Sequence, residues 1–141
     1  MKVSEYLDMM ARGEKLPKPR KHSTNEEHRL QCAEMRYIRA IHPELERVCF
    51  AVPNGQKRTS LQTSWLHDEG MVNGVADIIL LKPNKFNPYL CIENKTPIGK
   101  QSKEQKLFQE AVESQGGKYV IARSLDEFVK IIEDYLKDKA S

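Results

Sequence analysis

Two stretches of the sequence decide the fold: residues 76–81, ADIILL, and residues 89–95, YLCIENK. Each is a short run dominated by Ile, Leu and Cys, which predicts a strand covered on both faces. The polar segment 82–88 between them holds Pro83 and Pro88 and is typical of a turn. The pattern therefore predicts an antiparallel hairpin near the centre of a sheet.

Charged residues gather at one end of this predicted hairpin. If the chain reverses within segment 82–88, residues whose numbers sum to about 171 lie opposite each other, and Asp77 faces residues 93–95. Glu93 and Lys95 are two residues apart and therefore share one face of their strand. A register shift of one residue decides whether Asp77 shares that face, and we expect that it does.

Two carboxylates beside buried apolar strands need a cation, because an isolated buried charge is costly. Hard oxygen ligands with vacant positions suit Mg²⁺ or Mn²⁺. Lys95 would then hold or deprotonate an attacking water. The alternative is a set of ordinary surface residues joined by a weak salt bridge. The gathering of all three after a glycine-containing turn, Gly70 to Gly74, favours a functional site.

The segment before the hairpin predicts three elements. An amphipathic helix that ends before Pro43 opens with a capping box, either Ser23 with Glu26 or Thr24 with Glu27. A strand is expected over residues 48–52, followed by a short helix over 59–69 in which Trp65 is either a core residue or, less commonly, a platform for a base.

The segment after the hairpin predicts a helix over 103–115, a strand over 119–122 and a last helix over 124–136. Ser124 and Glu127 form the capping box of that last helix. The order of elements describes a three-layer α/β domain with a mixed sheet between helices, in which the fourth strand runs parallel to its partner.

Length and composition indicate one domain. The chain has 141 residues with 39% hydrophobic content, enough for a single core. We assign it to residues 23–141, and residues 1–22 to a basic arm that either contacts phosphates or is a solvated tail. No apolar run reaches membrane-spanning length and no secretory signal is evident, so a soluble, intracellular and cytoplasmic protein is expected. The three cysteines are expected to be buried reduced thiols, and a zinc site is not expected.

The motifs GVADIIL and CIENK, separated by a loop, resemble those of the PD-(D/E)XK nuclease superfamily. More specifically, the sequence is similar to the VRR-NUC family, the virus-type replication-repair nucleases. The likeness extends over residues 24 to about 135. Ala76 stands where such motifs usually have Pro. Further matching features are an early helical Glu27 with Gln31, the turn Pro53-Asn54-Gly55, and Ser102 with Gln105.

The resemblance implies a restriction-endonuclease-like αβββαβ core and a metal-dependent DNA endonuclease. Asp77 and Glu93 would bind the metal together with the backbone carbonyl of Asn94, and Lys95 would serve the nucleophilic water. Glu27 would approach the metal through a water or complete a second site, although helix phase leaves Glu26 open as the helical acid. Gln105 would orient the cluster or the phosphate.

The same resemblance implies branched or structured DNA as substrate and a homodimer as the working form. Polar and basic residues near the predicted site are candidates for contacts with phosphates: Asn54, Gln56, Lys57, Arg58, Lys100 and Lys103. Two other functions stay open, a nuclease-like module that binds nucleic acid without cutting it, and a restriction-type enzyme with base specificity.

Overall fold

The computed structural model describes residues 1–13, 26–53 and 58–141. Its centre is a four-stranded sheet in the order β1-β2-β3-β4. The first three strands pair antiparallel and the last pair is parallel, so the mixed sheet is confirmed. The strands are β1 (Cys49–Ala51), β2 (Ile78–Leu80), β3 (Leu90–Asn94) and β4 (Lys118–Ala122).

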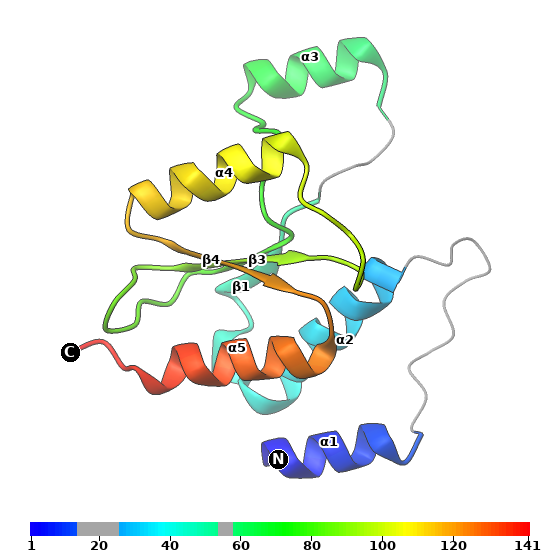
Figure 1. Cartoon of the computed structure of the whole chain (residues 1–141), viewed down its shortest axis with the longest axis vertical. Coiled ribbons are helices and arrows are strands. Elements are labelled where there is room, and N and C mark those ends of the chain that lie inside the picture. The colour runs from blue at the N-terminus through cyan, green and yellow to red at the C-terminus, as the bar shows by residue number, and fades with distance from the viewer. Residues whose placement is uncertain (14–25, 54–57) are drawn as a thin grey trace.

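Helices cover both faces of the sheet (Figure 1). One face packs on α4 (Lys103–Ser114), and the other packs on α2 (Glu26–Ile41) and α5 (Leu125–Lys137). A short 3-10 turn, η1 (Pro43–Leu45), leads from α2 to β1. The order α2, β1, β2, β3, α4, β4 is the predicted αβββαβ core, so the three-layer α/β fold is confirmed.

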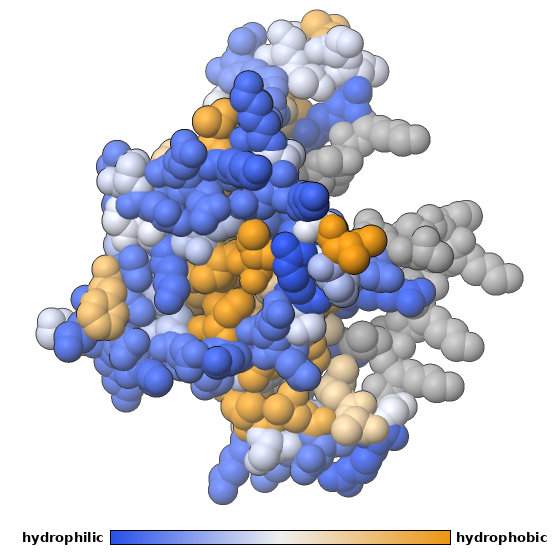
Figure 2. Space-filling view, in the orientation of Figure 1, coloured by the Kyte–Doolittle hydropathy of each residue, from blue (hydrophilic) through white to orange (hydrophobic). Residues whose placement is uncertain are grey.

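Alternation along the central strands divides the core into two halves. Ile78, Leu80 and Ile92 belong to the cluster packed under α2 and α5, whereas Cys91 belongs to the cluster under α4. Apolar side chains fill the space between α4 and α5, and hydrophilic side chains cover the outer surfaces of both helices (Figure 2). Even-numbered residues of β3 therefore face α2 and α5, and odd-numbered residues face α4.

Side-chain caps fix where the helices begin. Ser102 Oγ accepts a hydrogen bond from the Gln105 N–H at 3.2 Å at the start of α4. Ser124 Oγ accepts from the Glu127 N–H at 3.1 Å, but the Glu127 carboxylate accepts from the Arg123 N–H instead of closing a capping box. The alternative capping boxes at residues 23 and 24 lie outside the described residues.

The start of the expected basic arm is helical and packs on the core. Residues 3–11 form a helix, α1 (Val3–Ala11), whose Tyr6 is buried with its ring centroid 5.5 Å from that of Tyr37. Val3, Tyr6, Leu7 and Met10 recur at helical spacing and pack on the core, a pattern that the basic residues further along obscured. The basic residues at 15–21 lie outside the described residues.

The helix expected over 59–69 forms as α3 (Ser60–Asp68), and of the two alternatives given for Trp65 the position in the core is wrong. Trp65 is 60% exposed, and α3 extends away from the sheet beyond α4 (Figure 1). The thiol prediction holds for Cys49 and Cys91, whereas Cys32 is exposed. Among the described residues, no helix combines the length and the apolar character that crossing a membrane requires.

Candidate active site

The hairpin register places Asp77 opposite Glu93. Ile78 pairs with Ile92, so the next position outward joins residues 77 and 93, one less in sum than expected. Directly opposite residues of an antiparallel pair point to the same face. Asp77 also holds the end of β3, because its Oδ2 accepts a hydrogen bond of 2.7 Å from the Asn94 N–H. The predicted convergence of the two carboxylates is therefore present.

Glu93 is the centre of this cluster. Its side chain is only 3% exposed, and its Oε1 accepts a hydrogen bond of 2.8 Å from Gln105 Nε2. Lys95 Nζ, on the same face of the strand, lies 3.9 Å from the same oxygen. The other oxygen, Oε2, is buried and has no hydrogen-bond partner among the described residues. One carboxylate oxygen is thus held in place while the second is left without a protein donor.

The electrostatics of this cluster favour a bound cation. Burial, together with the nearby charge of Asp77, raises the pKa of Glu93 to about 8, and Lys95 opposes the shift. A divalent cation between the carboxylates would reverse the effect of their mutual repulsion. The oxygen donors and the unpartnered Oε2 fit Mg²⁺ or Mn²⁺, which prefer hard oxygen ligands.

Two carboxylates alone do not complete a coordination shell. In residues 1–13, 26–53 and 58–141, no group of three or more His, Cys, Asp and Glu side chains is arranged to hold a metal ion. Mg²⁺ commonly binds through one or two carboxylates and keeps several waters, so such a site leaves room for phosphate oxygens.

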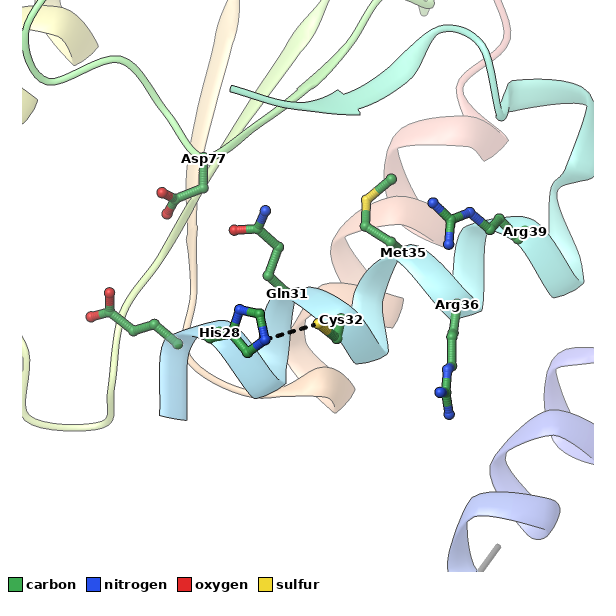
Figure 3. A pocket seen from close by; sticks show the side chains of 8 residues that line it. His28, Gln31, Cys32, Met35, Arg36, Arg39 and Asp77 are labelled. Carbon is green, nitrogen blue, oxygen red and sulfur yellow. Dashed lines mark hydrogen bonds between the residues drawn. The ribbon is translucent and has the colours of Figure 1, made fainter. Parts of the chain in front are cut away.

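Helix α2 brings one more acid, Glu27, near the cluster without completing a metal-binding group in the part of the chain that the structure describes. Glu27 and Asp77 both line a pocket of about 520 Å³, and Glu27 also raises the pKa of Glu93. Gln31, one turn along the helix, points toward Asp77 (Figure 3). Glu26 does not line this pocket and is exposed, so the geometry favours Glu27 as the helical acid.

Sequence reasoning missed a fourth carboxylate, Glu34, beneath the strand. The side chain of Asn94 points to the α2 face of the sheet, where its Nδ2 donates a 2.6 Å hydrogen bond to Glu34 Oε1. Glu34 is fully buried, and this burial raises its pKa to about 8. Glu34 sits in the apolar stripe of α2 between Ala33 and Tyr37, and that position was the available signal.

A second pocket, of about 250 Å³, opens on the other side of Asp77. Arg58 and Gln105 line it, and Arg58 Nη1 also contacts Met71 Sδ at 3.1 Å. Arg58 thus shares a pocket with two residues of the cluster, Asp77 and Gln105. Lys100 and Lys103 are exposed in the adjoining segment. The predicted contacts Asn54, Gln56 and Lys57 lie outside the described residues.

Comparison with known proteins tests the fold independently. No family model matches the sequence, and no curated protein matches it. Among solved structures, a "VRR_NUC domain protein" superposes with a TM-score of 0.72 at 19% identity, over 84% of this chain and 93% of that chain. The chain has the fold of a VRR_NUC domain protein. This likeness agrees with the resemblance of the motifs, and at 19% identity it speaks for the fold alone.

Proposed function

We propose that the protein is a metal-dependent deoxyribonuclease that hydrolyses phosphodiester bonds in branched or structured DNA. The observation that carries this proposal is the partly buried cluster of Asp77, Glu93, Lys95 and Gln105 at one end of the sheet, in which Glu93 itself is buried and its Oε2 is unpartnered. The fold of a VRR_NUC domain supports a nuclease-like function.

Asp77 and Glu93 are the proposed metal ligands, with the Asn94 carbonyl as a third and Glu27 reaching the ion through water. A bound Mg²⁺ or Mn²⁺ would lower the pKa of a coordinated water and offset charge on the phosphate. Gln105 keeps Glu93 in one rotamer by its hydrogen bond, which leaves the second oxygen free for the ion.

Lys95 and Arg58 are proposed to act on the reacting groups. The Lys95 ammonium, held beside Glu93, orients the attacking water toward phosphorus. The water oxygen forms a new P–O bond, one ester P–O bond breaks, and the departing oxygen takes up a proton. Arg58, Lys100 and Lys103 bind phosphates on either side of the cleaved bond, a role that fixes DNA position without reading sequence.

A homodimer is proposed as the working form, since two active sites related by a two-fold axis suit two strands of a junction. The mass of the protein in solution, measured by light scattering with and without a four-way junction, tests this state. The mass of a single chain under both conditions would contradict the homodimer.

The test of the proposed activity is a panel of labelled linear, flapped and four-way DNA incubated with Mn²⁺ or Mg²⁺ and, in parallel, with chelator. Lys95→Met keeps the apolar stem of the side chain and is expected to slow cleavage by at least about 100-fold. Its thermal stability should stay close to wild type. Lys130→Met, an exposed lysine of α5, is the matched control and should cut normally.

The outcomes separate the remaining functions. DNA left intact by the wild-type protein in every metal condition would favour the module that binds without cutting. Cleavage confined to one short sequence in a random library would favour the restriction-type enzyme. Metal-dependent cleavage that follows DNA structure, and that Lys95→Met removes, is the result we expect.

A further inference from the structure

The connection between β3 and α4 carries an unusually exposed apolar side chain close to the candidate site. Ile98 is 90% exposed, the largest exposed fraction among the large hydrophobic side chains of the described residues. It follows Lys95 by three residues. An apolar patch stands out beside this connection with hydrophilic side chains around it (Figure 2). Single exposed apolar residues are common, so the position of Ile98 matters only if the loop holds it there.

The loop does hold it there. The Gly99 N–H donates to the Thr96 carbonyl at 3.1 Å, which closes a turn with Pro97 and Ile98 at its tip. Arg123 Nη1 donates to the carbonyls of both Thr96 and Gly99, at 2.7 and 2.8 Å. The loop is thus fastened at both ends of the turn, with Ile98 at its exposed tip.

The anchor is itself tied to the rest of the fold. The Arg123 backbone N–H donates to the Glu127 carboxylate of α5 at 2.7 Å. Directly before the turn, the Lys95 N–H donates to the Ala122 carbonyl at 3.0 Å, which continues the pairing of β3 with β4. Ile98 therefore has a fixed place relative to Lys95 and the acidic cluster.

The charges around the tip point to a polyanion with accessible apolar faces. Residues 95–106 hold four lysines and one acid, Glu104. Lys100 and Lys103 are exposed on the α4 side of the tip, and Arg123 lies behind it. Phosphates meet such cations, and the faces of DNA bases meet an aliphatic side chain, so DNA satisfies both halves of this surface.

We propose that Ile98 is a wedge that inserts against the bases at a branch point and thereby selects branched DNA. This inference rests on the proposed nuclease function and deepens it. Apolar wedges between bases require unstacking, which costs a few kcal/mol per step in an intact duplex. At a junction or flap the stack is already interrupted, so the same insertion proceeds without that cost. Ile98 would determine where on DNA the site settles, while the acidic cluster cuts.

The experiment compares binding to a four-way junction and to a linear duplex of the same length, in chelator so that nothing is cut. Ile98→Ala is expected to weaken junction binding about ten-fold and to leave duplex binding unchanged. Ile98→Leu, which keeps the apolar volume, should restore junction binding. Leu81→Ala is the matched control, because Leu81 is a 53% exposed aliphatic residue at the opposite end of the hairpin.

A fluorescent base analogue beside the branch point reports insertion directly. Its emission should change when wild-type protein binds and stay nearly constant when Ile98→Ala binds. An unchanged junction-to-duplex affinity ratio in Ile98→Ala, or equal emission changes for both proteins, overturns the wedge.

Failure of the wedge and failure of the nuclease give different results. Metal-dependent cleavage with an unaltered preference in Ile98→Ala removes the wedge and leaves the nuclease. DNA that stays intact with Mn²⁺ removes the nuclease, and the affinity ratio measured in chelator still decides the wedge.

Discussion

Glu93 and Glu34 are both buried carboxylates, and they differ in the groups around them. Glu93 lies near Lys95, Gln105 and the carboxylate of Asp77, and a bound cation would offset the repulsion between the two carboxylates. Glu34 meets only the amide of Asn94 among its hydrogen-bond partners in the described residues. A buried carboxyl without a cationic partner is cheaper in its protonated form. Glu34 therefore acts as a neutral support beneath the strand that carries the site.

This assignment predicts how stability depends on pH. Glu34 has a pKa of about 8 in the folded protein and an ordinary value of 4.5. Between these values the folded state holds a proton that the unfolded state has lost, so the free energy of unfolding falls as pH rises. Glu34→Gln removes this part of the dependence. In chelator at pH 8 the variant should be more stable than wild type by on the order of 1–3 kcal/mol.

Denaturant unfolding measured from pH 4.5 to pH 8 checks this expectation. The advantage of Glu34→Gln should be small at the acidic end and largest at the alkaline end. Glu110→Gln, an exposed acid on α4, should follow the wild-type curve. A constant difference between Glu34→Gln and wild type across this range would show that Glu34 has the same ionisation in both states.

The sequence indicated some of these residues and not others for a physical reason. Asp77, Glu93 and Lys95 interrupt apolar strands, where alternation tells which of them share a face. Glu34 lies in a helix, where a polar residue within an apolar stripe is common and its partner on a strand cannot be read from spacing. Asn94 was predicted to contribute its backbone, and the role of its side chain needed the sheet-to-helix contact.

At the scale of elements, Gly74 joins the start of β2 to the start of α4. It has a φ of +80°, and a Cβ at this position would lie 2.4 Å from the backbone carbonyl of Glu104. Asp77 lies three residues after Gly74, and Gln105 directly follows Glu104. The close approach of Gly74 to Glu104 therefore brings Asp77 and Gln105 to the same pocket. A residue with a side chain could not occupy this position unless α4 moved.

Gly74→Ala is therefore expected to destabilise the fold by about 2 kcal/mol or more and to reduce cleavage, because Gln105 would move away from Glu93. Gly70→Ala is the matched control. Gly70 has a φ of +108°, and a Cβ added there would meet open space, so this variant tests backbone strain alone. Urea unfolding and initial cleavage rates measure both effects. Equal losses of stability and activity in the two variants would contradict a role for the close approach.

Periodicity predicted the elements that bury a continuous face and failed where burial depends on distant partners. The hairpin, α4, β4 and α5 were predicted because each has an apolar face that the sheet covers. The register came within one residue. Helix α1 escaped because nine residues among basic neighbours give a weak pattern. Trp65 was misplaced because sequence alone does not show that α3 extends away from the sheet.

At the scale of the whole molecule, the candidate site forms where one terminus of each of four elements lies at the same edge of the sheet. The start of α2, the start of β2, the end of β3 and the start of α4 supply Glu27, Asp77, Glu93 and Gln105. The net charge of +3 gives little general attraction for DNA. The DNA binding that we propose therefore relies on local cations and on the proposed metal, and we expect it to depend on the ion as well as on salt.

The central claim is that Asp77 and Glu93 together hold a divalent cation, and Mn²⁺ binding followed by electron paramagnetic resonance tests it most directly. Wild-type protein and the Glu110→Gln control should bind Mn²⁺ alike. Asp77→Asn and Glu93→Gln should each bind at least about ten-fold more weakly, and binding to wild type at pH 7 should release protons as Glu93 ionises. Wild-type protein that fails to bind Mn²⁺, or equal binding by all four proteins, would contradict the account.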